Sequence, residues 1–179
     1  MKTGCINTVC SGFVQTDSQI ALGSIIEPAS KYEGPQYEIQ LDVFKDLSSG
    51  GTWWLVFGRD KPVGYWPEEL FTNLSSHAEN MAWGGYAYGP KDRPSPPMGS
   101  SYFPFKGFGR ACYFRKIQLM DMYRAFYDPQ REDLSFGSES PCYGIVAGFL
   151  DENWRCSLLF GGPGCLLHDK DTIGAAQNP

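Results

Sequence analysis

The sequence predicts an all-β protein made of short antiparallel strands, and three observations support that prediction. Turn-forming residues recur along the whole chain, which contains 21 Gly and 13 Pro among 179 residues, so the segments between turns suit strands better than helices. Those segments are rich in β-branched and aromatic residues. One of them, 36–43, alternates apolar and polar side chains as a half-buried strand does.

Each expected element follows from the same signals. Residues 67–71 suit a short helical turn, because Pro67 can occupy a first helical position and the acidic Glu68 and Glu69 follow it. Residues 89–99 form a loop, since four prolines there remove too many backbone donors for a sheet. The expected strands are 12–15, 19–26, 36–43, 52–57, 62–66, 80–88, 110–120, 142–149 and 154–160.

The alternating segment 36–43 also predicts which side chains are buried. Side chains on a strand point to opposite faces in turn, so one set faces the core and the other faces water. The inward set is Tyr37, Ile39, Leu41 and Val43, and the outward set is Glu38, Gln40 and Asp42.

The charge and hydropathy of the chain argue against binding to nucleic acid and against a membrane span. The formal net charge is -5, and the 15 Lys and Arg are scattered, so no basic patch for nucleic acid is expected. No apolar run approaches the roughly 20 residues that cross a bilayer, and the start of the chain lacks the apolar region of a signal peptide. We expect one domain over 1–167, followed by a polar tail over 168–179 that frays.

The cysteine and histidine content bears on compartment and chemistry. Six cysteines in an acidic chain favour an oxidising compartment and hence secretion. This expectation conflicts with the absence of a signal peptide from the sequence. Either the start is missing or the protein is not exported. His77 and His168 lack metal-ligand partners at a zinc-site spacing, so no metal or cofactor is expected. Carboxylates and aromatics remain as the functional side chains.

Seven ordered stretches resemble one known family. The stretches are Gly12-Phe13-Val14-Gln15-Thr16, Ala21-Leu22-Gly23-Ser24, Gly51-Thr52-Trp53-Trp54-Leu55, Val63-Gly64-Tyr65-Trp66-Pro67, Leu70-Phe71, Ala82-Trp83-Gly84-Gly85 and Phe160-Gly161-Gly162-Pro163-Gly164. In this order and spacing they resemble the plant neprosin family, secreted glutamic peptidases that favour cleavage next to proline, over residues 4–165.

The resemblance implies a fold and a mechanism. It implies an antiparallel β-sandwich whose concave face holds a cleft, with two glutamates facing each other across it. One carboxylate must be ionised to activate water while the other is protonated to donate to the amide, and two neighbouring acids divide these roles by splitting their pKa values. The implied partner is a proline-containing peptide or protein.

The same resemblance indicates that this chain is inactive. In neprosins the first glutamate lies on a strand upstream of the segment that corresponds to Cys5 and Cys10. Because this sequence starts at Met1, we expect it to lack the family's first strands and that glutamate. The second glutamate follows Trp-Gly-Gly, and here Trp83-Gly84-Gly85 is followed by Tyr86. A phenol, with a pKa of about 10, cannot serve as the ionised base in acid. Trp83 and Tyr86 are then expected to line the cleft.

Other interpretations of these residues stay open. The segment 83–86 could hold a buried Trp beside a β-bulge with an ordinary Tyr. A shifted alignment would promote Glu79, whereas Glu68 and Glu69 fit a solvated helical turn. The alternative function is a non-catalytic module that binds a peptide or a glycan on an aromatic face.

Covalent features complete the expectations. The resemblance implies disulfides between Cys5 and Cys10 and between Cys142 and Cys165. Cys112 and Cys156 depart from the family pattern and form either a third bridge or two buried thiols. Asn73-Leu74-Ser75 is an acceptor triplet for N-glycosylation.

Overall fold

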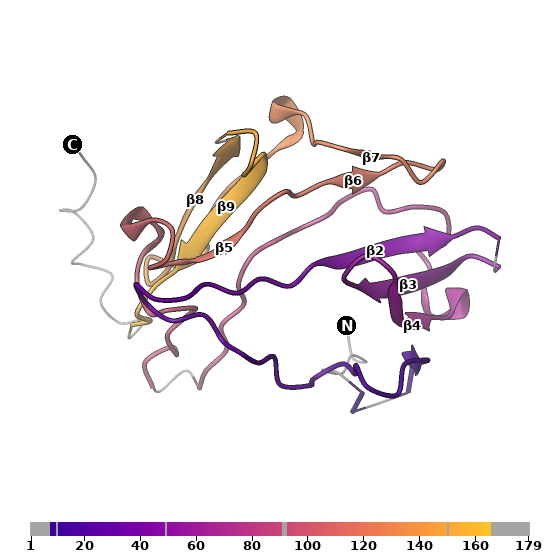
Figure 1. The fold of residues 1–179 in the computed structure, drawn as a ribbon, viewed down its shortest axis with the longest axis horizontal. Coiled ribbons are helices and arrows are strands. Elements are labelled where there is room, and N and C mark those ends of the chain that lie inside the picture. Colours follow the sequence, from indigo (N-terminus) through magenta and orange to yellow (C-terminus); the bar gives the residue numbers. More distant parts are fainter. Residues whose placement is uncertain (1–7, 10, 49, 91–92, 150, 166–179) are drawn as a thin grey trace. The chain divides into compact units, whose positions relative to one another are not determined.

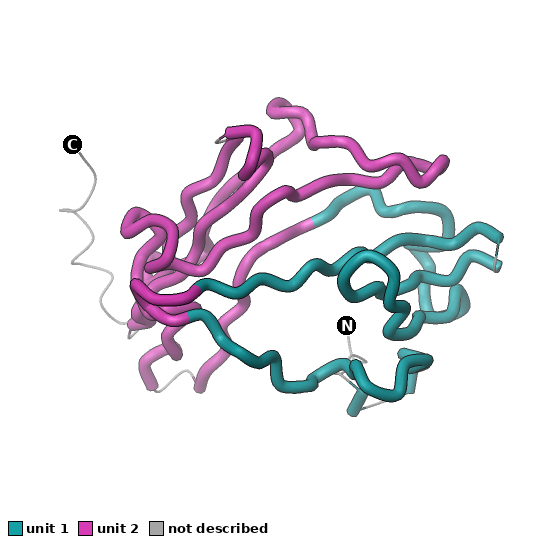
Figure 2. Tube along the Cα trace, in the orientation of Figure 1, with its two compact units in different colours: residues 1–30, 36–81 teal, residues 31–35, 82–179 magenta. Residues whose placement is uncertain are grey.

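The protein is described by a computed structural model, which covers residues 8–9, 11–48, 50–90, 93–149 and 151–165. Its contacts divide the chain into two compact units, 1–30 with 36–81 and 31–35 with 82–179 (Figure 2). Each unit is described by itself below, and the β-sandwich over 1–167 stays a prediction. In the described part of the chain, no helix has the length and apolar character that crossing a bilayer requires.

Unit 1 contains one antiparallel sheet with the strand order β1-β4-β3-β2 (Figure 1). Its strands are β1 (Val14–Gln15), β2 (Leu41–Asp46), β3 (Thr52–Phe57) and β4 (Lys61–Trp66), and a 3₁₀ turn η1 (Glu68–Leu70) follows them. The chain reverses between β3 and β4 at Gly58, whose φ of 67° favours glycine. Leu55, Val56 and Val63 are buried in this sheet.

Unit 2 is built on a second antiparallel sheet with the order β5-β9-β8 and on a separate hairpin of β6 and β7 (Figure 1). The core is the buried set Ile117, Cys156 and Leu158, against which the half-buried Trp83 and Phe160 pack. The elements are η2 (Pro104–Lys106), β5 (Cys112–Phe114), β6 (Leu119–Met120), β7 (Phe126–Tyr127), η3 (Arg131–Asp133), β8 (Gly144–Phe149) and β9 (Cys156–Gly161).

The all-β prediction is confirmed, and several elements lie where the sequence placed them. The expected strand 52–57 coincides with β3, and the expected strands 12–15, 62–66, 142–149 and 154–160 overlap β1, β4, β8 and β9. The helical turn expected over 67–71 contains η1. The described residues of the loop over 89–99 contain no strand, although Met98 forms an isolated β-bridge with Gly162.

Two expected strands are wrong, and the local chemistry explains one of them. Residues 19–26 form no strand, because the backbone N–H groups of Gln19 and Ile20 donate to Asp17 Oδ1 at 2.7 Å each and fold the chain into a turn. Residues 80–88 belong to no strand. The expected strand 110–120 is interrupted at Lys116, whose φ of 55° separates β5 from β6.

The predicted burial of 36–43 is also wrong. The strand begins only at Leu41, and Leu41 and Val43 are 51% and 56% exposed while Asp42 is half-buried. Tyr37 and Ile39, expected in the core, are exposed as well. An alternating pattern separates the two faces of a strand but does not distinguish a central strand from an edge strand, and β2 is the end strand of its sheet.

Candidate functional site

The segment that carries the candidate site, Trp83 to Tyr86, contacts the core of unit 2 at Trp83. Trp83 is half-buried and packs against the cluster of Ile117, Cys156 and Leu158. A side chain packed in this way is held by apolar contacts on the core. Trp83 therefore anchors the segment to the sheet of β5, β8 and β9.

Gly84 and Gly85 differ in their surroundings. A methyl group placed on Gly85 would meet Met98 Sδ and lie 2.7 Å from the ring of Phe160, whereas one on Gly84 would meet nothing within 4 Å. Glycine is thus required by close packing at 85 but not at 84. This close approach fixes the backbone immediately before Tyr86.

Tyr86 points away from that packing. Its side chain is 89% exposed, and no hydrogen bond to its hydroxyl occurs within the described residues. Tyr88, two residues later, is 80% exposed. The segment is therefore half-buried at Trp83 and open to solvent at Tyr86.

The remaining sequence candidates lie in unit 1 and do not form an acid pair. The carboxylate of Glu68 pairs with Lys45 at 3.3 Å, and Glu69 and Glu79 are exposed. His77 Nδ1 lies 3.0 Å from the hydroxyl of its neighbour Ser76, and His168 is outside the described residues. No group of three His, Cys, Asp or Glu side chains that could hold a metal ion occurs in the described part.

Unit 2 also contains a surface region lined by several carboxylates, which the sequence did not predict. It is a surface hollow of about 460 Å³, here called the carboxylate hollow, lined by Asp128, Arg131, Phe149, Asp151, Glu152 and Arg155. Neither Trp83 nor Tyr86 lines it. No sequence pattern indicates this hollow, because its central ion pair joins residues 27 positions apart.

Two acids of the carboxylate hollow, Asp128 and Asp151, are engaged in the fold. Arg155 Nε donates to Asp128 Oδ2 at 3.0 Å, and Arg155 Nη2 lies 2.8 Å from Asp128 Oδ1, so the two side chains form an ion pair. Asp151 Oδ1 accepts the backbone N–H groups of Asn153 and Trp154, both at 2.8 Å. The guanidinium of Arg131 lies 4.9 Å from the ring centre of Phe149. This arrangement stabilises a turn and commits Asp128 and Asp151 to the fold.

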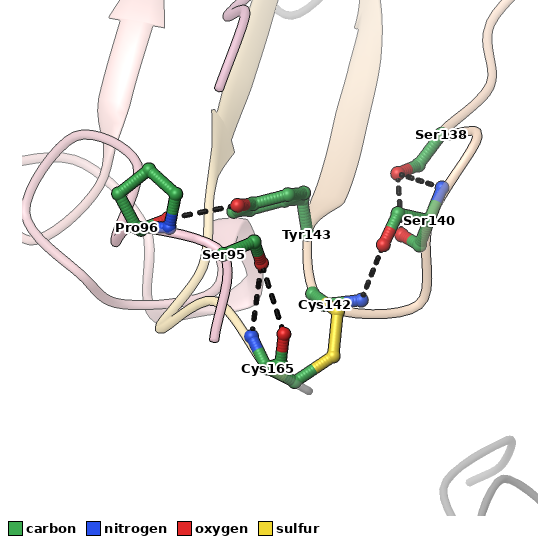
Figure 3. Close-up of a disulfide and its surroundings, with 7 residues drawn as sticks. All are labelled: Ser95, Pro96, Ser138, Ser140, Cys142, Tyr143 and Cys165. Carbon is green, nitrogen blue, oxygen red and sulfur yellow. Dashed lines mark hydrogen bonds between the residues drawn. A yellow bond between two sulfur atoms is a disulfide. The ribbon is translucent and has the colours of Figure 1, made fainter. Parts of the chain in front are cut away.

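The described cysteines behave in two ways. Cys142 and Cys165 form a disulfide with a Cα separation of 5.3 Å (Figure 3). The hydroxyl of Ser95 donates to the Cys165 carbonyl at 3.2 Å and accepts its N–H at 3.1 Å, and the Tyr143 hydroxyl donates to the Pro96 carbonyl at 2.8 Å (Figure 3). The disulfide and these hydrogen bonds hold the segment that follows β9 to the residues before β8 and to the loop residues Ser95 and Pro96.

Cys112 and Cys156 are free thiols. The strand register places Cys112 opposite Phe160 and Cys156 opposite Phe149, so the two cysteines are four positions apart along β9 and beyond the reach of a bridge. Burial raises the pKa of both thiols, which disfavours the reactive thiolate. Cys5 and Cys10 lie outside the described residues.

Comparison with known protein families agrees with this description. The family model described as Neprosin matches residues 1–163 of the 179. The match includes every strand of both units and the whole Trp83–Tyr86 segment.

Proposed function

The chain belongs to the neprosin family, and on that premise we propose that it is a member that does not hydrolyse peptide bonds. The observation that carries this proposal is the identity and exposure of Tyr86 directly after Trp83-Gly84-Gly85. The family's mechanism takes one acid as the base and another as the proton donor. A phenol at one of the two positions removes that division of roles.

Three described acids of unit 2 are engaged in the fold. In unit 2, Asp128 is paired with Arg155, and Asp151 accepts backbone N–H groups. Glu33 is paired with Arg110 at 2.7 Å. These contacts commit at least one oxygen of each of the three carboxylates to the fold, which supports the proposed loss of function.

The test is a cleavage assay with the whole chain. A proline-containing peptide is incubated with it in acid, and the products are identified by mass spectrometry beside an active member of the family. We expect the peptide to be recovered intact. Cleavage next to proline that follows the chain through purification and rises with its concentration would contradict the proposal.

A second candidate function, non-catalytic binding of a proline-containing peptide or a glycan, is favoured by one cluster in unit 2. Phe108, Tyr113 and Trp154 form an aromatic triad with ring centres 5.2 to 5.3 Å apart. The guanidinium of Arg115 lies 5.9 Å from the Trp154 ring centre. Phe108 is 55% exposed, so the triad offers an apolar surface of the kind on which prolines and sugar rings pack.

A matched pair of variants tests this second function. We expect Phe108→Ala to weaken binding to a peptide or glycan array at least several-fold, because it removes the exposed ring of the triad. Phe105→Ala removes a more exposed ring that stacks on Phe103 outside the triad, and it should leave binding unchanged. Equal effects of the two variants, or no binding by the wild type, would exclude the triad.

We further propose that the protein acts outside the cytosol. The family match and the Cys142–Cys165 disulfide support this location, since such bridges persist in oxidising compartments.

A further inference from the structure

The turn that follows η1 in unit 1 presents one asparagine without a structural role. Asn73 is exposed and lies in a turn rather than in a strand. Its side chain makes no hydrogen bond, ion pair or ring contact with any residue that the structure describes. A group attached to the Asn73 amide would therefore replace no contact that the fold uses.

The same turn is fixed from its inner side. The indole Nε1 of Trp53 donates to the carbonyl of Leu74 at 3.0 Å, and Lys45 Nζ donates to the carbonyl of Ser75. Leu74 is half-buried, and the Ser75 hydroxyl donates to the Thr72 carbonyl at 3.0 Å. These contacts hold the residues after Asn73 against the sheet and leave the Asn73 side chain outside.

We propose that Asn73 is a site of N-linked glycosylation. Asn73-Leu74-Ser75 has the required hydroxyl two residues after the asparagine and no proline between them. The co-reactant is a lipid diphosphate-linked oligosaccharide. The Asn73 amide nitrogen bonds to the anomeric carbon of that sugar, the bond from this carbon to the diphosphate oxygen breaks, the amide gives up one proton and the lipid diphosphate leaves.

Other asparagines of the chain do not meet these conditions. Asn80 is exposed but is followed by Met81 and Ala82. Asn153 is followed by Trp154 and Arg155, and its Oδ1 accepts a hydrogen bond from Arg115 at 3.3 Å. Asn73 is the one asparagine in the sequence with a Ser or Thr two residues later. The proposal therefore predicts a single glycan at a known position.

The test expresses the full chain behind a cleavable secretory leader in eukaryotic cells. The chain is recovered from both the medium and the cell lysate, so that retention inside the cell does not prevent the measurement. Peptides are mapped by mass spectrometry after release of N-glycans in heavy-oxygen water, which marks each formerly glycosylated asparagine. The variants are Asn73→Gln, Ser75→Ala, Ser75→Thr and, as the matched control, Asn80→Gln.

We expect the greater part of the wild-type chain to carry the mark at Asn73. Asn73→Gln and Ser75→Ala should abolish it, the second while leaving Asn73 in place, and Ser75→Thr and Asn80→Gln should retain it. An unmarked Asn73 in wild-type chain whose leader has been removed, in cells that glycosylate a co-expressed secreted glycoprotein, would overturn the proposal. The result does not depend on whether the protein cleaves peptides.

Discussion

Neighbouring glycines in the segment 83–86 have unequal roles. Gly85 lies against Met98 and Phe160, whereas Gly84 borders open space. The Trp-Gly-Gly triplet could be recognised in the sequence, but this difference could not. It depends on contacts with residues far along the chain, such as Met98 in the loop 89–99. The same limit applies to Trp83, whose contacts with Ile117 and Leu158 involve residues more than 30 positions away.

The first prediction compares these two glycines. Gly85→Ala should lower the free energy of unfolding by about 1–3 kcal/mol, because the added methyl group overpacks a closely packed position. Gly84→Ala should have a smaller effect, since its methyl group meets no atom. Urea unfolding of the two variants and the wild type measures the difference, and equal destabilisation would show that residue 85 is not closely packed.

A second prediction concerns Asp17 and acid. Hydrogen bonds from the backbone N–H groups of Ile20 and then Gln19 hold the pKa of the Asp17 carboxyl below its ordinary value of 3.8. The ionised form is therefore favoured in the folded state. Its contribution to stability is present above the unfolded-state pKa and is lost as pH falls through the lower folded-state pKa.

Asp17→Asn keeps an acceptor but removes the charge, so it isolates this effect. The wild type should be more stable than the variant at neutral pH, and the advantage should shrink below a pH of about 4. Unfolding measured at several pH values gives the comparison. An advantage that stays constant through the acid range would contradict the assigned hydrogen bonds.

At the scale of elements, strands with strong β propensity and clear turn boundaries could be predicted, and those decided by tertiary contacts could not. The adjacent Trp53 and Trp54 made 52–57 recognisable as β3. The short strand β7 was missed, since its hairpin depends on Asp121, whose Oδ1 accepts the N–H groups of Tyr123 and Ala125 at 2.8 and 2.9 Å. Side-chain capping of this kind breaks or redirects strands without a periodic signal.

The third prediction concerns the bridge that joins the end of β9 to the start of β8. Replacing Cys142 and Cys165 by Ser should lower the free energy of unfolding by about 3 kcal/mol, because the bridge closes a loop with a sequence separation of 23. Cys112→Ser, which removes a half-buried free thiol, is the control and should cost less. If the double variant is as stable as the control, the bridge does not constrain the unfolded chain.

At the scale of the whole molecule, the family could be recognised from seven short stretches, and one residue, Tyr86, motivates the proposal that peptidase activity is lost. The antiparallel β architecture agrees with the family assignment. The carboxylate hollow and the aromatic triad could not be predicted, because each brings together side chains from distant segments. Function in such a domain depends on a few side chains held by a common fold.

The most direct test of the central claim is the pH dependence of peptide hydrolysis by the whole chain. Cleavage of a proline-containing peptide is measured as heavy oxygen taken from water into new carboxyl termini, from acid to neutral pH, with a mock purification as the blank. We predict incorporation at the level of the blank at every pH. A bell-shaped profile above the blank would reveal two cooperating titrating groups and would contradict the claim.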